Sequence, residues 1–334
     1  MVSRVGADFV WLRLMAVRIV APGDYPAQVG GSPHLERLAA YGEVVVYPDL
    51  PATEDERLER VRGADVIINS HGSMKWTATM LDRMEGVRLF SLCSVGTDAV
   101  DLEAARRLGI TVSNQGDSTS AIVAEHEFAL MLATARRLGD STREMRAGGW
   151  PDVQLTTLRG KTVGIVGTGN SGLQMARLCK ALGMEVVAWS FRQKADAARE
   201  IGFRYLELDE LLQASDVVSL HVGLSEQTRG MIGAAQFGLM REGTILVNGS
   251  RGPVVDTAAL VEALRSGKLG GAGLDVFDPE PLPPGHPLAA LDNVVMSPHA
   301  ADATPEGFEL LTKTAIDNIV AFLDGRPQNV VTPS

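Results

Sequence analysis

A glycine-rich run at residues 163–172 constrains the fold more than any other part of the chain. The run reads VGIVGTGNSG, an apolar stretch that breaks at Gly167, Gly169 and Gly172. The apolar residues before the glycines predict a strand, and the helical spacing of apolar residues over 173–182 predicts a helix. The apolar run at 185–189 predicts a second strand. The sequence therefore predicts a βαβ unit whose first turn carries a G-x-G-x-x-G motif.

This spacing suits a dinucleotide. One glycine allows the tight turn, the second lets the backbone approach a pyrophosphate, and the third lets the helix pack closely on the strand. The helix N-terminus then presents unpaired amides and its positive dipole end to the phosphates. A glycine-rich surface turn would give the same letters, but the flanking strand and helix favour a nucleotide site. The expected cofactor contacts at this turn are Gly167, Gly169, Asn170, Ser171 and Gly172.

The end of the second strand bears on which dinucleotide binds. An acidic residue about 20 positions after the glycines usually meets the adenosine ribose, and Ser190 holds that place here. Ser190, followed closely by Arg192, offers a hydroxyl and a guanidinium, which suit a 2′-phosphate. The sequence therefore favours NADP(H). NAD(H) stays open as the alternative, in which Arg192 is a solvated surface residue and the ribose contact is weaker.

Composition limits the class of protein. With 334 residues, 45% of them hydrophobic and 22% charged, the chain is typical of a globular protein of two domains. A formal net charge of −10 argues against nucleic acid or an anionic membrane surface as the main partner. Cys93 and Cys179 lack metal-ligand or redox spacing, so neither a disulfide nor a metal site is expected. Without an apolar run of membrane-spanning length or a signal peptide, a cytoplasmic location is expected. Residues 1–14 are either a loose extension or a product of start-codon choice.

Apolar runs alternate with helical segments on both sides of the glycine motif. Strands separated in this way favour parallel pairing. A long apolar helix over 119–137, with Ser118 or Thr119 as its N-cap, is expected to join two α/β units. A shorter helix is expected at 33–41, and the proline-rich stretch 279–287 is expected to be a loop. The remaining expected strands are residues 17–20, 44–47, 65–69, 88–92, 216–221, 244–247, 271–275 and 293–297.

Polar side chains follow three of the later strands: Arg251 in NGSRG, Asp275 and Glu280 in DVFDPEP, and His299 in SPHA. Ligands of open α/β sheets bind beyond the carboxyl ends of the strands. The Arg251 fork suits the carboxylate and carbonyl of a 2-oxo acid, while His299 would donate a proton as hydride reaches the carbon. Glu280 would hold the imidazole and favour its charged form. Each residue alone has a structural alternative, but their combination after a dinucleotide motif favours catalysis.

The run from Gly167 through NGSRGPVVD, LDVFDPEPLP and SPH resembles the D-isomer-specific 2-hydroxyacid dehydrogenase family over nearly the whole chain. The resemblance implies that Arg251, Glu280 and His299 are the catalytic residues. It also implies that Asp275 binds the nicotinamide carboxamide. The segment CSVGTDAVD matches an early family motif, so the backbone of Val95 and Gly96 should meet the substrate carboxylate, with Asp98 more structural in role.

The same resemblance implies the architecture. Two Rossmann-like α/β domains, one flavodoxin-like and one NAD(P)-binding, would carry parallel sheets on either side of an interdomain cleft. Residues 1–114 and 301–334 would form a discontinuous substrate-binding domain, and 115–300 the inserted NAD(P)-binding domain, with the long helix supporting a homodimer. Further site residues expected on this basis are His71 and Gly72 for the substrate and Val222, Gly249, Ser250 and Ala301 for the cofactor.

The chain departs from the family pattern in three places. Ser190 replaces the usual acidic residue, and Ser-Phe-Arg at 190–192 is similar to the pattern of NADPH-preferring glyoxylate and hydroxypyruvate reductases. Ala301 stands where the family often has the glycine of an HxG run. The substrate-facing loop, with His71, Ser73, Met74 and Trp76, is a less common set, which leaves the acid open; a structural role for His71 is an equal alternative.

The expected function is reversible reduction of a small 2-oxo acid, such as glyoxylate or hydroxypyruvate, to a D-2-hydroxy acid, with interdomain closure excluding water. The alternative is a non-catalytic NAD(H)-sensing module or corepressor on the same fold, which would not need Arg251, Glu280 and His299 together. Glu280 argues against formate dehydrogenases, which have glutamine there. No appended regulatory domain, as phosphoglycerate dehydrogenases often have, is expected.

Overall fold

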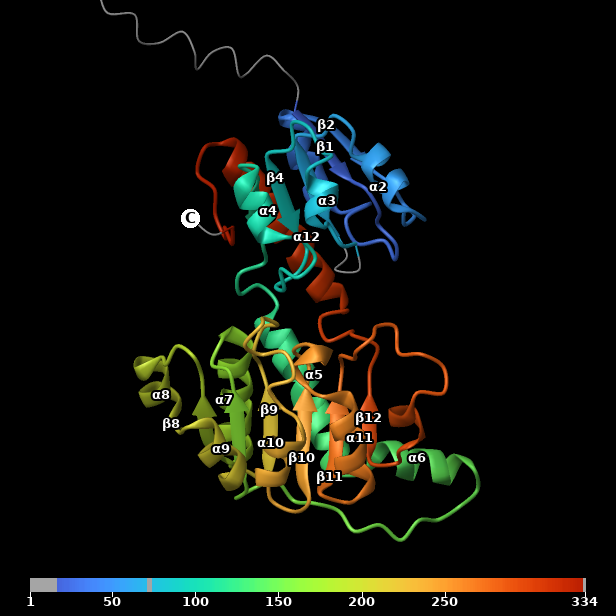
Figure 1. Cartoon of the computed structure of the whole chain (residues 1–334), viewed down its shortest axis with the longest axis vertical. Coiled ribbons are helices and arrows are strands. Elements are labelled where there is room, and N and C mark those ends of the chain that lie inside the picture. The colour runs from blue at the N-terminus through green and yellow to red at the C-terminus, as the bar shows by residue number, and fades with distance from the viewer. Residues whose placement is uncertain (1–16, 71–73, 333–334) are drawn as a thin grey trace, which may run out of the picture. The chain divides into compact units, whose positions relative to one another are not determined.

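The structure is a computed structural model, and it describes residues 17–70 and 74–332 (Figure 1). The chain divides into two compact units: unit 1 contains residues 1–119 and 304–334, and unit 2 contains residues 120–303. Both boundaries fall a few residues later than the domain boundaries expected from the sequence. Residues 1–14 and the candidate substrate residues His71 and Gly72 lie outside the described residues.

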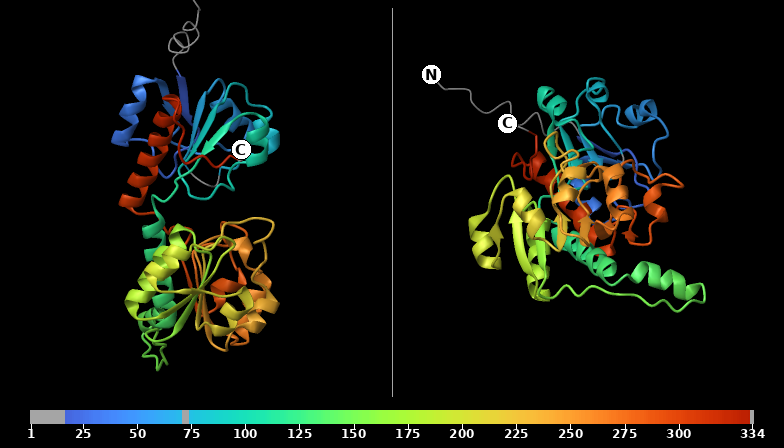
Figure 2. Two further views of the ribbon diagram at one scale, coloured as in Figure 1. Left: turned by 90° about the vertical axis from the view of Figure 1, so that its left-hand side faces the viewer. Right: turned by 60° about the horizontal axis from the view of Figure 1, so that its bottom comes forward.

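Unit 1 is built on a five-stranded parallel sheet with the strand order β2-β1-β3-β4-β5. β3 and β4 are buried along their whole length, which is why they read as short continuous apolar runs. Helices η1 and α12 pack on one face of the sheet, and α2, α3 and α4 on the other (Figure 2, left). The elements are β1 (Val17–Ala21), η1 (Pro33–Ala40), β2 (Gly42–Val46), α2 (Glu54–Arg60), β3 (Val66–Asn69), α3 (Ala78–Leu81), β4 (Leu89–Leu92), α4 (Leu102–Arg107), β5 (Thr111–Ser113) and α12 (Pro305–Leu323).

Unit 2 has a seven-stranded parallel sheet in the order β12-β11-β10-β9-β6-β7-β8. Helices α5, α7 and α8 pack on one face, and α9, α10 and α11 on the other. Its elements are α5 (Ser120–Ala135), α6 (Leu138–Arg146), β6 (Thr162–Val166), α7 (Asn170–Leu182), β7 (Glu185–Trp189), α8 (Ala195–Ile201), β8 (Arg204–Tyr205), α9 (Leu208–Ala214), β9 (Val217–Leu220), α10 (Ala234–Leu239), β10 (Thr244–Asn248), η2 (Gly252–Val254), α11 (Thr257–Arg265), β11 (Leu269–Leu274), η3 (Pro287–Ala290) and β12 (Val294–Met296).

The strand order of unit 2 fixes where a ligand can bind. From β6 the chain builds outward through β7 and β8, and it then returns to place β9 on the other side of β6. The carboxyl ends of β6 and β9 therefore form a topological switch point, where open α/β sheets bind their ligands. Because all the pairings are parallel, the polar residues after β10, β11 and β12 lie along the same edge.

The expected strands and the α/β class are confirmed, and four details differ. The sequence missed β5 and β8, which are too short to show a periodic pattern. The segment expected as a helix at 33–41 is a 3₁₀ helix. Neither candidate caps α5, because the Ser118 hydroxyl donates to Gln115 and the Thr119 hydroxyl has no partner among the described residues. α5 also lies wholly within unit 2.

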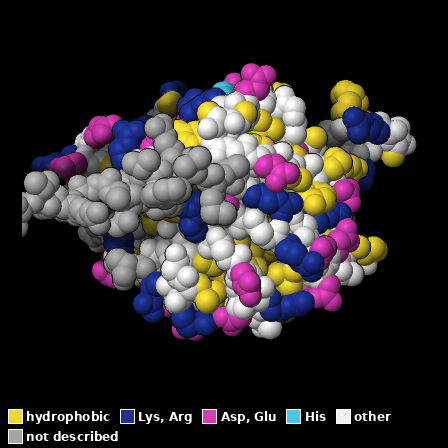
Figure 3. Space-filling view, turned by 90° about the horizontal axis from the view of Figure 1, so that it is seen from above, with side chains coloured by type: hydrophobic (Ala, Val, Ile, Leu, Met, Phe, Trp, Pro, Cys, Tyr) yellow, Lys and Arg dark blue, Asp and Glu magenta, His cyan; other side chains and the backbone are white. Residues whose placement is uncertain are grey.

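The surface mixes both charges. On the face in Figure 3, acidic and basic side chains are interspersed with apolar ones. α6 is joined to the loop before β12 by the ion pair Arg143–Asp292, 2.9 Å long. α6 and the segment after it expose several apolar side chains, of which Trp150 is the most accessible at 87%. Within the described residues, no helix is both long enough and apolar enough to cross a membrane.

Candidate active site

The three glycines of the motif have different surroundings. Gly167 has a φ of 104°, a conformation that L side chains rarely adopt, and a Cβ there would lie 2.7 Å from the carbonyl oxygen of His221. A Cβ on Gly172 would lie 2.1 Å from the carbonyl oxygen of Gly167, so the helix packs directly on the turn. A Cβ on Gly169 would meet nothing within 4 Å. The first and third glycines are therefore needed by the fold, whereas the second borders open space.

The start of α7 fits a pyrophosphate. Gly169 is its N-cap and has no side chain with which to cap the first amides, which include those of Asn170 and Ser171. These amides point out of the helix with the positive dipole end behind them. Open space above Gly169 and free helix amides are the features that bind a nucleotide phosphate. The residues at this turn therefore fit a dinucleotide cofactor.

The residues after β7 are those expected to meet the adenosine ribose of the cofactor. Ser190 follows the strand and is half-buried, whereas Arg192 is exposed. The rings of Trp189 and Phe191 pack edge to face with centroids 4.7 Å apart, which fixes the course of the loop. Among the described residues no acidic side chain pairs with Arg192. Its guanidinium is thus available to a ligand phosphate.

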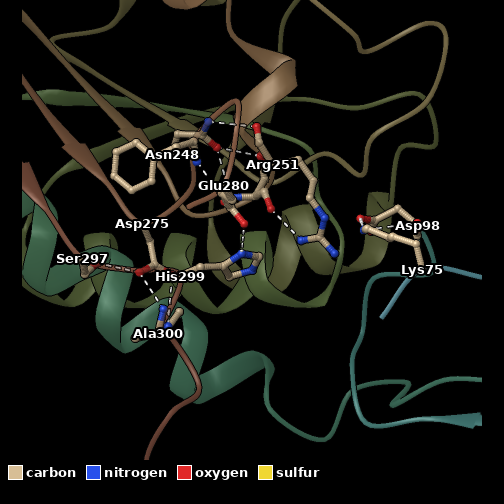
Figure 4. A network of polar contacts seen from close by, with 12 residues as sticks. Lys75, Asp98, Asn248, Arg251, Asp275, Glu280, Ser297, His299 and Ala300 are labelled. Carbon is tan, nitrogen blue, oxygen red and sulfur yellow. Dashed lines mark hydrogen bonds and ion pairs between the residues drawn. The ribbon is translucent and has the colours of Figure 1, made fainter. Parts of the chain in front are cut away.

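His299 and Glu280 form a direct pair. Nδ1 of His299 lies 2.8 Å from Oε2 of Glu280 (Figure 4), and the amide of Phe277 donates to the other carboxylate oxygen at 2.9 Å. The hydrogen bond with Glu280 raises the pKa of His299 above its ordinary value, although burial opposes this. Burial also works against ionisation of Glu280, but the hydrogen bonds from His299 and Phe277 outweigh it and lower its pKa. The pair therefore favours an imidazolium beside a carboxylate, with Nε2 left for a substrate.

Asp275 holds the loop that carries His299. This fully buried carboxylate accepts hydrogen bonds from the Ser297 hydroxyl at 2.6 Å and from the amides of Ala300 and Ala301 at 2.9 and 3.0 Å. The amide of His299 donates to the carbonyl of Asp275 at 2.8 Å. His299 has a φ of 52°, which costs a non-glycine residue conformational energy. Asp275 thus holds His299 in a strained backbone conformation.

Arg251 lies close enough to the pair for its charge to act on both groups: it opposes the rise in the pKa of His299 and adds to the fall in the pKa of Glu280. Its carbonyl accepts a hydrogen bond from the Asn248 amide group at 3.1 Å, and its guanidinium donates to the carbonyl of Ser250 at 2.7 Å. Asn248 also accepts from the backbone and the hydroxyl of Ser250. The strand end after β10 is therefore a compact turn that carries the Arg251 guanidinium beside the His299–Glu280 pair (Figure 4).

In unit 1 the expected substrate loop has a distinctive backbone. The Asn114 side chain donates to the carbonyl of Val95 at 2.7 Å, and the Ser94 hydroxyl donates to the carbonyl of Gly96 at 2.7 Å. Within the described part of the chain, no acceptor takes the amides of Val95 and Gly96. Fixed carbonyls beside free amides suit an anionic ligand. The nearby residues Lys75 and Asp98 form an ion pair of 3.2 Å within this unit (Figure 4).

The structure thus brings Arg251, Asp275, Glu280 and His299 together at one edge of the unit 2 sheet. The other expected cofactor residues lie along the same edge: Val222 after β9, Gly249 and Ser250 after β10, and Ala301 in the loop held by Asp275. Ala301 has no positive φ, so alanine is accommodated where the family often has glycine.

Sequence reasoning missed two supporting groups. His126 on α5 lies with Nε2 2.8 Å from the Ser297 hydroxyl and 3.5 Å from Asp275. Asn248 organises the turn that holds Arg251. The sequence did contain a sign of His126, because Glu-His-Glu at 125–127 interrupts an otherwise apolar helix.

A glycine turn that fits a dinucleotide and a histidine–carboxylate pair lie at the carboxyl edge of one parallel sheet, an arrangement typical of nicotinamide-dependent dehydrogenases. Residues 128–301 match the family model described as "D-isomer specific 2-hydroxyacid dehydrogenase, NAD binding domain". A glyoxylate reductase of Aeropyrum pernix is 39% identical over 308 residues, which cover 89% of this chain and 92% of that protein. The chain belongs to the D-isomer-specific 2-hydroxyacid dehydrogenase family.

Solved structures agree. The TT0316 protein from Thermus thermophilus superposes with a TM-score of 0.83 at 38% identity, over 94% of this chain and 100% of that one. An acyclic imino acid reductase in complex with NADPH and D-Arg has a TM-score of 0.85 at 26% identity over the same shares. The family resemblance inferred from the sequence is confirmed: the protein is an NAD(P)-dependent 2-hydroxyacid dehydrogenase. The comparisons give no support to the alternative of a non-catalytic binding module.

Proposed function

We propose that the enzyme reduces a small 2-oxo acid to a D-2-hydroxy acid, with His299 and Glu280 as the acid–base pair and Arg251 as the substrate anchor. The 2.8 Å contact between His299 and Glu280 carries this proposal, because it keeps a proton available at an accessible edge of the sheet. The same contact allows the reverse reaction, since an imidazole that gives up a proton can also take one back.

The chemistry divides between cofactor and protein. When bound, the nicotinamide supplies the hydride that becomes bonded to C2 of the acid. Arg251 holds the carboxylate and carbonyl by its forked donors, which stabilises charge that grows on the oxygen. His299 donates the proton that completes the hydroxyl, and Glu280 stabilises the imidazolium beforehand and fixes its orientation. The balanced reaction consumes the 2-oxo acid, NAD(P)H and one proton, and yields the 2-hydroxy acid and NAD(P)⁺.

In this proposal each unit binds a different ligand group. Unit 1 would bind the substrate carboxylate through the amides of Val95 and Gly96, whose carbonyls are tied back by neighbouring side chains. Unit 2 would bind the dinucleotide at the glycine turn. Asp275 would use the remaining acceptor position of Oδ2 for the carboxamide, since this oxygen accepts a single amide in the structure. Further cofactor contacts are proposed for Val222, Gly249, Ser250 and Ala301; contacts of His71 and Gly72 with the substrate remain predictions.

The preferred cofactor in this proposal is NADPH. Ser190 brings no negative charge that would repel a 2′-phosphate, and the exposed Arg192 has a guanidinium without an acidic partner among the described residues. The structural neighbour solved with NADPH is consistent with this choice. Ser190→Asp should shift the ratio of kcat/KM values toward NADH by roughly tenfold or more, as one unfavourable charge contact is worth about 1.4 kcal/mol. An unchanged preference for NADPH in that variant would place the recognition elsewhere.

Glyoxylate and hydroxypyruvate are the proposed substrates, supported by the glyoxylate reductase of Aeropyrum pernix among the relatives. A panel of 2-oxo acids, assayed with NADPH and NADH in parallel, tests the substrate class and the cofactor together. His299→Gln serves as the matched control, because it should lower turnover by roughly 100-fold or more while the NADPH Kd stays near the wild-type value. Equal turnover of wild type and His299→Gln would reject the assigned proton donor.

We also propose a homodimer. α6 and the segment after it expose Leu138, Met145, Trp150 and Leu155, four apolar side chains on one stretch of chain. A second copy of this chain would cover them, because a twofold interface uses the same patch on both subunits. Trp150→Ser should lower the molar mass measured by light scattering from two chains toward one at micromolar concentration. A dimer of unchanged stability would place the interface on another surface. A cytoplasmic location stays a prediction.

A further inference from the structure

A second histidine–carboxylate pair is buried behind the cofactor edge of unit 2. Glu127 lies on α5 and is 1% exposed, and the side chain of His221, which follows β9, is completely buried. Nδ1 of His221 lies 3.1 Å from Oε2 of Glu127, and its Nε2 lies 2.9 Å from the Ser219 hydroxyl. The reaction proposed above uses none of these groups. A buried carboxylate is costly unless it has a partner, so the pair needs an explanation.

His221 touches the glycine turn on two sides. Its amide donates to the carbonyl of Val166, the last residue before the motif, at 2.7 Å. Its own carbonyl would lie 2.7 Å from a Cβ on Gly167, and its Cβ would lie 3.2 Å from a Cβ on Gly172. The next residue is Val222, whose side chain also packs on Gly167. The position of His221 therefore sets the position of the turn that fits the pyrophosphate.

Glu127 connects the same histidine to the neighbouring strand end. A Cβ on Gly249 would lie 2.4 Å from Oε1 of Glu127 and 2.7 Å from its Cγ. The φ of Gly249 is not in the left-handed region, so its backbone does not require glycine. The space that a side chain at position 249 would fill is occupied by the Glu127 carboxylate. Glu127 cannot move away without losing His221, because it is enclosed in the core.

We propose that Glu127 and His221 are positioning residues of the dinucleotide site, which hold the ends of β9 and β10 against the glycine turn. Glu127 fills the space left by Gly249, and His221 buttresses Gly167 and Gly172. The inference rests on the proposed placement of the cofactor at that turn. It assigns no contact between the pair and the cofactor; the pair acts through Val222 and Gly249.

A double-mutant cycle on the full chain tests the packing part. Glu127→Ala should raise the NADPH Kd about tenfold, and Gly249→Ala should do the same because its methyl displaces the carboxylate. In the Glu127→Ala background, Gly249→Ala should cost about twofold or less, since the methyl then enters vacated space. For Glu127→Ala the change should appear in the NADPH Kd, with kcat at saturating cofactor within about threefold of wild type, because His299 and Arg251 are untouched. Equal costs of Gly249→Ala in both backgrounds would overturn the proposal.

The isosteric variant Glu127→Gln separates charge from packing and covers the case in which Glu127→Ala does not fold. It keeps the volume, so Gly249→Ala should remain as costly in this background as in wild type. Its own NADPH Kd should rise at least about threefold, because an amide is a weaker partner for His221 than the carboxylate. A Kd within error of wild type would overturn the role of the pair.

Thr134→Ala is the matched structural control. Thr134 is buried on the same helix, but it packs against Gly271 near the start of β11, away from the glycine turn. It should lower the melting temperature without changing the NADPH Kd; an equal rise in Kd would show that any damage to α5 weakens binding. If wild type binds neither NADPH nor NADH, the proposed cofactor site fails. If wild type binds and Gly169→Ala weakens binding while the Glu127 variants do not, only the positioning role fails.

Discussion

Gly172→Ala should damage the fold itself. Its Cβ would lie 2.1 Å from the carbonyl oxygen of Gly167, whereas ordinary contacts begin near 3.4 Å, so the turn or the helix must move by about 1 Å. Both partners are backbone of a buried strand–turn–helix unit, which leaves no flexible group to give way. Overpacking of this kind costs about 2–3 kcal/mol. For a unit of this size, that corresponds to a fall in melting temperature of roughly 5–10 °C.

Gly169→Ala should behave in the opposite way. Its Cβ would meet nothing within 4 Å, and its φ of −65° is one that alanine adopts freely. Alanine is a poorer N-cap than glycine, but it also restricts the unfolded chain, and these terms of about 0.5–1 kcal/mol each nearly cancel. The melting temperature should therefore stay within roughly 2 °C of wild type. The methyl occupies the space in which a pyrophosphate would approach the backbone, so the cofactor Kd should rise about tenfold or more.

Thermal melting without cofactor and fluorescence titration with NADPH measure the two effects on the same samples. We expect Gly172→Ala to lower the melting temperature and Gly169→Ala to weaken binding with the fold intact. A destabilised Gly169→Ala protein that binds NADPH normally would refute the division between a packing glycine and a binding glycine.

Three further outcomes follow from the acid–base edge. In the proposed mechanism reduction requires protonated His299, so the rate falls as pH rises through the pKa of His299. Glu280→Gln removes the partner that raises this pKa, so the falling limb of the kcat/KM profile should move to lower pH. Arg251→Lys keeps the charge but loses the fork, so substrate KM should rise about tenfold with the NADPH Kd unchanged, as measured by initial rates and titration. Asp275→Asn replaces one acceptor oxygen by an NH2 group that faces the amides of the loop at 300–301. The free energy of unfolding, measured by denaturant titration, should fall by about 2–4 kcal/mol, and kcat should also fall. An unchanged unfolding curve would show that Asp275 does not hold the His299 loop.

The sequence predicted the parts of this site that depend on backbone chemistry. Gly167 and Gly172 could be predicted because only glycine fits their positions: Gly167 has a positive φ, and a Cβ on Gly172 would lie 2.1 Å from the carbonyl oxygen of Gly167. Such constraints fix the spacing of glycines in the sequence. The catalytic candidates were readable because parallel strands deliver their carboxyl ends to one edge, so that residues far apart in the chain, such as Arg251 and His299, converge.

What the sequence could not supply is the set of partners reached by side chains. Asp275 follows a buried strand, and nothing in its neighbourhood shows that its carboxylate accepts the amides of the loop at 300–301. The short strands β5 and β8 escaped prediction for a related reason, since two or three residues form a strand only because neighbours are already in place. The role of Gly249 was equally hidden, because the carboxylate that fills its side-chain space comes from Glu127 on a helix far earlier in the chain.

α5 supplies two of the contacts that could not be predicted from the sequence. Two successive residues near its middle reach different strand ends: His126 contacts Ser297 in the loop after β12, and Glu127 contacts His221 after β9. Successive side chains on a helix point about 100° apart, so one helix lying across the sheet can support strand ends on both sides of β10. The polar interruption of an apolar helix is therefore explained by the edge it supports. Because the same turn of α5 backs both the proposed proton donor and the proposed nucleotide turn, substitutions at 126 should alter kcat, whereas substitutions at 127 should alter cofactor binding.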